Sequence, residues 1–153
     1  MMKKKIGLTL STVMLGSLLM LAGMAYANGF SGWPTLSKGS SGGYVSGLQA
    51  SLYAMGQQPS VGAVDGIFGT GTETGLINFQ TNTGLVADGI AGSDTWSEFH
   101  DWATFETYTL WYLDTSYSST YWTSFALTNN ETKLTYRVSY KGSNTSVYSG
   151  TVY

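Results

Sequence analysis

Two stretches of the sequence, "DGIFGTGT" (Asp65–Thr72) and "DGIAGSDT" (Asp88–Thr95), share the pattern Asp-Gly-Ile-x-Gly-x-x-Thr. Asp-Gly favours a turn, because the Asp side chain accepts hydrogen bonds from nearby backbone N–H groups and glycine takes positive φ without a Cβ penalty. We therefore expect two similar loop-to-helix corners whose isoleucines point inward. The motif residues are Asp65, Gly66, Ile67, Gly69 and Thr72 in the first corner and Asp88, Gly89, Ile90, Gly92 and Thr95 in the second.

The sequence around the corners predicts three helices. Residues 43–56 place apolar side chains at intervals of three and four, which is one face of an amphipathic helix. Residues 70–84 begin with Thr70 and Glu73 at the spacing of a capping box and end at a glycine. Residues 93–102 begin with a serine that can act as the N-cap. Each corner therefore leads directly into a helix.

The order of these motifs resembles the peptidoglycan-binding domain of the PG_binding_1 type over about residues 36–99. The matching pieces are Leu-x-x-Gly at 36–39, Leu48-Gln49, the first corner, Phe79-Gln80, Gly84-Leu85 and the second corner followed by Trp96. The resemblance implies a small helical domain that binds peptidoglycan in a shallow groove between the helices and the corners. It implies Tyr44, Asp65 and Gln80 as ligand-binding candidates. Each has a structural alternative: Tyr44 covering the core, Asp65 holding its turn, and Gln80 bracing a corner.

The sequence after residue 103 changes its period. "KLTYRVSY" (133–140) alternates strictly between apolar and polar side chains, which is typical of a half-buried strand. The segments 105–113, 121–128 and 146–153 show weaker versions of the same alternation. We therefore predict a small antiparallel β-meander of about four strands and an α+β fold overall.

Aromatic residues are concentrated in this β segment. Thirteen of the 22 aromatic residues lie in residues 101–153, more than one face of a small sheet needs. The first interpretation is a role in the core or between domains. The alternative is an exposed platform for stacking sugar rings, because the apolar face of a pyranose fits an indole or phenol ring. Its candidates are Trp111, Tyr117, Tyr121 and Trp122, and Trp111 and Trp122 join the predicted ligand-binding residues.

The first residues have the pattern of a secretory signal peptide. Three lysines at 3–5 precede an apolar run at 6–24 that closes on Ala-Tyr-Ala, so we expect cleavage after Ala27 and a location outside the cell or in its envelope. The predicted organisation is a signal peptide (1–27), an N-terminal linker (28–35), a peptidoglycan-binding-like helical domain (36–103) and an aromatic-rich β segment (104–153).

Composition excludes several classes of function. Without the three leader lysines, four basic residues face nine acidic ones, so nucleic acid is a poor partner, and after signal cleavage we expect no membrane partner. One histidine (His100) and no cysteine predict neither a metal site nor a cofactor. Asp65 and Asp88 stand in the same Asp-Gly motif, so we interpret both as turn-forming residues rather than as the paired carboxylates of a glycosidase. No catalytic residue is assigned.

The sequence therefore predicts a secreted, non-catalytic protein that binds peptidoglycan or another cell-wall polymer, with a separate cell-wall enzyme as a further partner. The alternative is a scaffold or interaction module whose aromatic β segment binds a partner protein or an extracellular polysaccharide. An enzyme site within the β segment is a third hypothesis.

Overall fold

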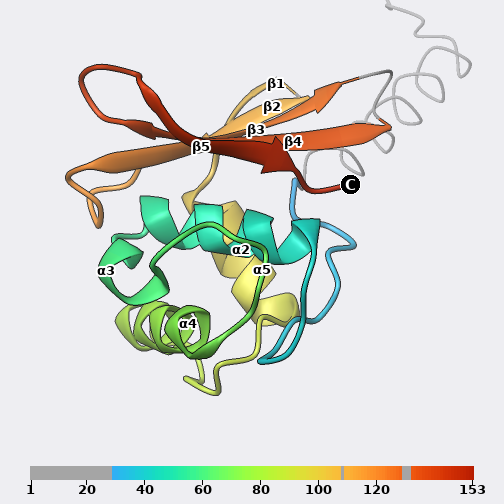
Figure 1. Cartoon of the computed structure of the whole chain (residues 1–153), viewed down its shortest axis with the longest axis vertical. Coiled ribbons are helices and arrows are strands. Elements are labelled where there is room, and N and C mark those ends of the chain that lie inside the picture. Colours follow the sequence, from blue (N-terminus) through green and yellow to red (C-terminus); the bar gives the residue numbers. More distant parts are fainter. Residues whose placement is uncertain (1–28, 108, 129–131) are drawn as a thin grey trace, which may run out of the picture.

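The computed structural model describes residues 29–107, 109–128 and 132–153, and the predicted signal peptide lies outside them. The chain forms helices first and then a sheet, which confirms the α+β class (Figure 1). The helices are α2 (Gly43–Ala54), α3 (Gln58–Val61), α4 (Thr70–Thr83) and α5 (Ser93–Trp102). The strands are β1 (Thr104–Thr107), β2 (Leu110–Leu113), β3 (Tyr121–Thr128), β4 (Lys133–Tyr140) and β5 (Ser146–Thr151). The short α3 was not predicted.

The sheet is an antiparallel meander in the order β1-β2-β3-β4-β5. It has one strand more than the predicted four or so, because the segment 105–113 splits into β1 and β2, which pair through Phe105 and Trp111. Near the break, the hydroxyl oxygen of Thr107 accepts a hydrogen bond from the backbone N–H of Thr109 (3.2 Å), a local bond that favours a turn.

Helix α2 lies between the sheet and the other helices (Figure 1). The sequence predicts a one-sided amphipathic helix, but α2 is buried on nearly every side, because the sheet covers the face that would otherwise meet water. Its buried residues are Val45, Gly47, Leu48, Gln49, Ala50, Ser51, Leu52, Tyr53 and Ala54.

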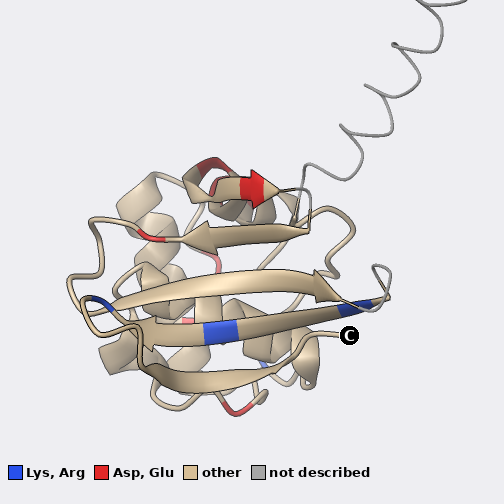
Figure 2. Ribbon diagram, turned by 90° about the horizontal axis from the view of Figure 1, so that it is seen from above, with Lys and Arg blue, Asp and Glu red and all other residues tan. Residues whose placement is uncertain are grey.

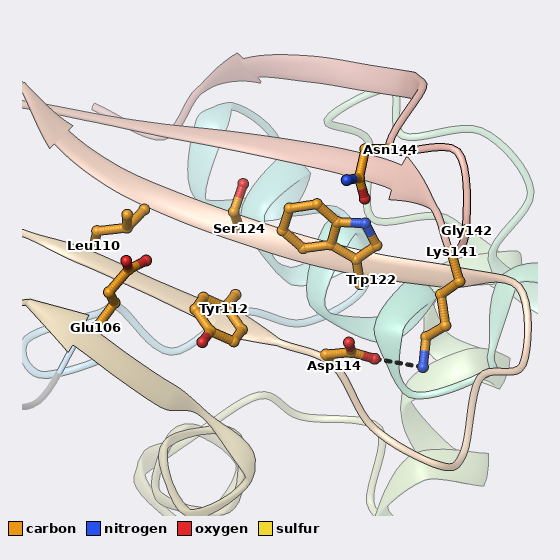
Figure 3. Close-up of a pocket in the computed structure, with 9 residues that line it drawn as sticks. All are labelled: Glu106, Leu110, Tyr112, Asp114, Trp122, Ser124, Lys141, Gly142 and Asn144. Atoms are coloured by element: carbon orange, nitrogen blue, oxygen red, sulfur yellow. Dashed lines mark ion pairs between the residues drawn. The ribbon is translucent and has the colours of Figure 1, made fainter.

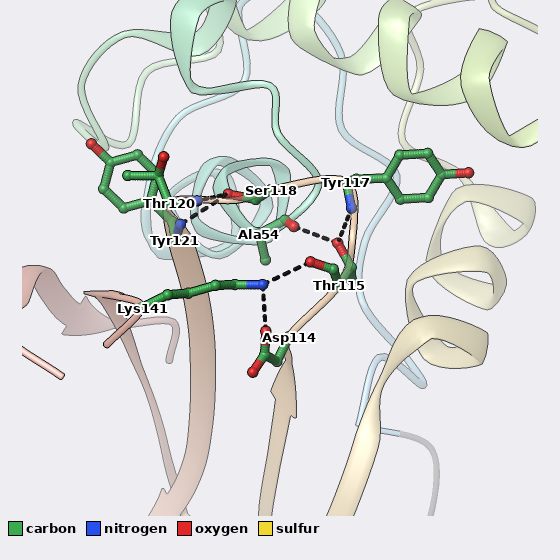
Figure 4. A network of polar contacts seen from close by, with 8 residues as sticks. All are labelled: Ala54, Asp114, Thr115, Tyr117, Ser118, Thr120, Tyr121 and Lys141. Atoms are coloured by element: carbon green, nitrogen blue, oxygen red, sulfur yellow. Dashed lines mark hydrogen bonds and ion pairs between the residues drawn. The ribbon is translucent and has the colours of Figure 1, made fainter. Parts of the chain in front are cut away.

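Small residues let the sheet approach α2 closely. A Cβ added to Gly43 would lie 2.3 Å from the carbonyl oxygen of Val152, so only glycine fits there. Two threonine hydroxyls from the β segment donate to carbonyls of α2, Thr123 to Ala50 (2.6 Å) and Thr115 to Ala54 (2.7 Å; Figure 4). Gly43, Gly47, Ala50 and Ala54, spaced four, three and four apart, therefore form the stripe on which the sheet rests.

One hydrophobic core contains residues of the predicted linker (28–35), of the helices and of the sheet. Phe30, from the expected linker, is buried against helical and sheet residues alike. Its ring centroid lies 6.3 Å from Trp96 of α5 and 5.6 Å from Phe125 of β3. Trp33 is also buried, 5.0 Å from Trp96. Residues 29–35 thus fill the seam between the helices and the sheet.

Candidate functional site

The first corner is braced by a glutamine from α2. The amide oxygen of Gln49 accepts the backbone N–H groups of Asp65 (3.0 Å) and Gly66 (2.9 Å). Its amide nitrogen donates hydrogen bonds to Asp65 Oδ1 (2.9 Å), the carbonyl of Ile67 (3.1 Å) and the hydroxyl of Thr72 (3.0 Å). Oδ1 of Asp65 also accepts the N–H of Ile67 (2.9 Å). Every polar group of this buried amide therefore holds the turn in place.

The second corner repeats this arrangement around Gln80 of α4. Its amide oxygen accepts the N–H of Gly89 (2.9 Å), and its nitrogen reaches Asp88 Oδ1 (3.0 Å), the carbonyl of Ile90 (3.0 Å) and the hydroxyl of Thr95 (3.3 Å). Asp88 Oδ1 accepts the N–H of Ile90 (2.9 Å). The repeat in the sequence is therefore a repeat of one hydrogen-bond network, each with its own glutamine.

Sequence reasoning missed the role of Gln49 and left that of Gln80 open. The available signal was the pair of an apolar residue and glutamine, Leu48-Gln49 and Phe79-Gln80, placed once before each corner. In both pairs the apolar residue and the glutamine are buried, so a polar side chain among core residues needed a partner within reach.

The predicted capping arrangements are wrong. The residues that precede α4 and α5 are Gly69 and Gly92, and neither helix has a side-chain cap. The carboxylate of Glu73 instead meets Lys38 Nζ at 2.9 Å, while Ser93 is the first residue of α5. Thr72 lies in the first turn of α4, where its hydroxyl accepts a hydrogen bond from the side-chain amide of Gln49 (3.0 Å).

Both corner isoleucines point outward, contrary to prediction. Ile67 is 60% exposed and Ile90 41% exposed. The residue that follows each isoleucine is the buried one, Phe68 in the first corner and Ala91 in the second. Since the two isoleucines occupy equal positions, each repeat presents one apolar side chain to solvent.

A short segment links the two corners. Leu36 exchanges backbone hydrogen bonds with Ala91 (3.1 and 2.8 Å), and Gly42 donates to the carbonyl of Gly66 (2.9 Å). Ser41 and Ile67 also form a bridge. The two bridge points, Leu36 and Ser41, are five residues apart, at most about 18 Å. We call the exposed surface of residues 36–42, 65–69 and 88–92 the corner face.

Comparison with known proteins assigns this part of the chain. The model of the PG_binding_1 family, a peptidoglycan binding domain, matches residues 41–98, which contain both corners. The crystal structure of the SleB N-terminal domain is similar at 39% identity over 45% of this chain and 92% of that chain, with a TM-score of 0.42. The helical half belongs to this family. No curated protein matches the chain.

Within the peptidoglycan binding domain, the predicted ligand-binding residues occupy different settings. Asp65 is exposed on the corner face, and its pKa is held below the ordinary value, first by the hydrogen bond from Gln49 and then by the N–H of Ile67. Gln80 is buried in its brace. Tyr44 is half-buried at the start of α2, where its ring contacts Trp33 (5.4 Å) and Tyr153 (5.7 Å). Ligand contact by these three residues stays a prediction.

The aromatic candidates of the β segment divide between the two faces of the sheet. Trp111 is 2% exposed and stacks on Phe125 (5.6 Å) in the core. Trp122 lies on the outer face of the sheet, away from the peptidoglycan binding domain (Figure 3). Tyr121 packs on Tyr53, with ring centroids 5.1 Å apart, and Tyr117 is exposed. Of the two predicted tryptophans, only Trp122 therefore lines a hollow at the surface.

Two further observations concern the described part of the chain alone. None of its helices is long and apolar enough to cross a membrane. Residues 29–107, 109–128 and 132–153 contain no cluster of three or more His, Cys, Asp or Glu side chains that could hold a metal ion.

Proposed function

We propose that the protein is a secreted, non-catalytic cell-wall protein that binds peptidoglycan through the corner face. The observation that carries the proposal is the family match over residues 41–98, which contain both glutamine-braced corners. Secretion is supported by the signal-peptide pattern of residues 1–27.

The corner face offers the contacts that a glycan with short peptide stems requires. Ile67 and Ile90 can cover apolar faces of sugars or stem side chains. The hydrogen bonds that shape the corners use Oδ1 of Asp65 and Asp88, so Oδ2 is the atom that can accept from a ligand hydroxyl or amide. Lys38 is half-exposed beside Glu73 and can meet a stem carboxylate.

A binding role is favoured over a catalytic one at this face. A carboxylate pair acting on a glycosidic bond needs one member with a raised pKa. The pKa of Asp65 is lowered instead, and both carboxylates are committed to their turns by backbone N–H groups. Within this proposal, a separate cell-wall enzyme is a further partner.

Co-sedimentation with purified insoluble peptidoglycan tests the proposal. We expect the purified protein to pellet with the wall and a clearly smaller fraction of the double variant Ile67→Asp/Ile90→Asp to do so. Both side chains are exposed, so the variant should keep its fold, which circular dichroism would check.

Tyr117→Ser is the matched control, because Tyr117 is also an exposed large side chain. Its backbone packs against Gly56, just past the C-terminal end of α2, whereas Gly66 of the first corner is hydrogen-bonded to Gly42 at the N-terminal end. The helix has 12 residues and is therefore about 18 Å long. Equal pelleting of the double variant and the control would overturn the corner face as the binding surface.

A further inference from the structure

The outer face of the sheet carries two adjoining hollows that the corner face does not include. One, of about 470 Å³, is lined by residues of β1, β2, β3 and the turn after β4, and the other, of about 510 Å³, by residues of β2 to β5. Leu110 and Ser124 line both, so the hollows join into one groove across the strands. We call this the outer groove. Its volume is in the range of small-molecule sites.

An aromatic pair stands at one end of the outer groove. The rings of Trp122 and Tyr112 lie edge to face, with centroids 6.4 Å apart and planes at 86° (Figure 3). The floor beside them is made of small side chains, Ser124 and Ala126. On the opposite face of the same strands, Trp111 and Phe125 are covered by the core. The outer rings are therefore the ones that a ligand can reach.

Polar side chains surround these rings with little unbalanced charge. Lys141 pairs with Asp114 at 2.5 Å and also donates to the carbonyl of Thr115 (2.8 Å), which neutralises and fixes it (Figure 4). The remaining charged lining residues are Glu106 and Arg137, one of each sign. Figure 2, which looks onto this face, shows few charged residues along the strands. Such a surface gives no electrostatic hold to a polyanion.

The turn after β4 supplies an amide. Asn144 lines the groove beside Trp122 and has positive φ (55°), a conformation that asparagine tolerates better than most residues. Its side chain carries both a donor and an acceptor. Together with Glu106 and Ser124, it can exchange hydrogen bonds with hydroxyl and acetamido groups.

We propose that the outer groove is a second binding site, separate from the corner face, for a glycan strand of N-acetylated hexoses. One pyranose ring lies against Trp122, where its polar substituents meet Asn144 and Ser124, and a neighbouring sugar of the strand reaches Glu106 beside Leu110 (Figure 3). The groove presents a half-buried indole among hydroxyl, amide and carboxylate groups. This mixture fits a sugar ring, which has an apolar face and polar substituents, better than a protein helix or strand, which buries a more continuous apolar surface. Two glycan sites on one chain would also raise the avidity for a polymer.

Titration with a soluble tetrasaccharide of β-linked N-acetylglucosamine tests this site directly. We expect calorimetry on the purified protein to show binding, and Trp122→Ala to weaken it by about tenfold or more through loss of ring contact. Trp102→Ala is the matched control, because Trp102 is an exposed tryptophan on α5 that packs on Tyr117 instead. Its affinity should equal that of the unaltered protein.

Two further variants, Asn144→Gly and Glu106→Gln, test the outer groove if Trp122→Ala does not fold. Glycine takes the same positive φ and removes only the amide, and glutamine keeps the shape while removing the charge. We expect weaker tetrasaccharide binding from Asn144→Gly. We expect the same of Glu106→Gln, and either no binding by the unaltered protein or unchanged binding in both Asn144→Gly and Glu106→Gln overturns the outer groove.

The two binding proposals fail separately. The variant Ile67→Asp/Ile90→Asp should bind the tetrasaccharide as the unaltered protein does, because its substitutions lie outside the outer groove. Loss of tetrasaccharide binding in that variant would place the sugar at the corner face and overturn the second site.

Discussion

The two corners repeat one motif but carry different numbers of backbone hydrogen bonds. Gln49 accepts two backbone N–H groups, from Asp65 and Gly66, while Gln80 accepts one, from Gly89. The N–H of Asp88 is taken instead by the carbonyl of Val86 (3.0 Å).

The connections that lead to the two corners also differ. Between Gln49 and Asp65 the chain includes the end of α2 and all of α3, whereas Gln80 reaches Asp88 across the end of α4 and a short loop. The longer connection needs the stronger brace, because more chain must be ordered to form the turn. The two corners thus have a similar local hydrogen-bond network but order connections of different length.

Replacing the glutamines should give the largest difference between the corners. Gln49→Ala leaves two backbone donors without their partner, one of them the buried Gly66 N–H, and we expect a loss of about 3–4 kcal/mol in the free energy of unfolding. Gln80→Ala leaves one and should cost about 2 kcal/mol. Urea midpoints at constant m-value measure both changes. Equal losses in the free energy of unfolding would contradict the inference that the first corner depends more on its glutamine.

Alanine at the motif glycines should give the next largest effects. Gly66 and Gly89 have φ of 74° and 71°, which costs alanine roughly 1–2 kcal/mol at either position. At Gly66 a new Cβ would also lie 2.9 Å from Ser46 Oγ and 3.2 Å from the carbonyl oxygen of Gly42, whereas at Gly89 the nearest atom is Glu73 Cγ at 3.3 Å. Thermal melting should show the greater fall in Tm for Gly66→Ala, and the reverse order would contradict this reading.

The charge of Asp65 should add a smaller, pH-dependent contribution. Its pKa is lowered in the folded state, so the charged form stabilises the fold above the unfolded pKa of about 4, and this contribution is lost as the pH falls through the folded value. Asp65→Asn should therefore be less stable than the unaltered protein at pH 6 and close to it at pH 2.5, by urea unfolding at each pH. A stability difference between the two proteins that increases as the pH falls would contradict the lowered pKa of Asp65.

The ion pair of Lys38 with Glu73 should contribute least. Both side chains are substantially exposed, so a double-mutant cycle with Lys38→Ala and Glu73→Ala should give a coupling of roughly 0.5 kcal/mol or less that shrinks with added salt. A coupling that salt does not change would mean that the pair is better shielded than its exposure indicates.

The elements that depend on local sequence could be predicted. The repeated corners, the three longer helices and the strict alternation of "KLTYRVSY" each follow from neighbouring residues. Gly84 ends α4 in the left-handed conformation, as its sequence position indicates. The capping box failed because Gly69, not Thr70, is the N-cap of α4, and Glu73 pairs with the distant Lys38.

The features that depend on distant residues could not be predicted. Nothing near Phe30 or Trp33 in the sequence shows that the sheet and α5 close around them. Trp111 and Trp122 have similar aromatic surroundings in the sequence, but strand register turns one inward and the other outward. The outer groove adds Tyr112 and Asn144, and no pattern in the sequence pairs either of them with Trp122.

The stripe of small residues on α2 has a consequence for the order in which the molecule is completed. A chain made from its N-terminus exposes Gly43, Ala50 and Ala54 long before Thr115, Thr123 and Val152 exist to cover them. The packing of α2 is therefore complete only after the C-terminal strands have been made, and such contacts between residues distant in sequence slow folding. We therefore expect the docking of the sheet on α2 to be a late step of folding, although α2 is the first long helix to be made.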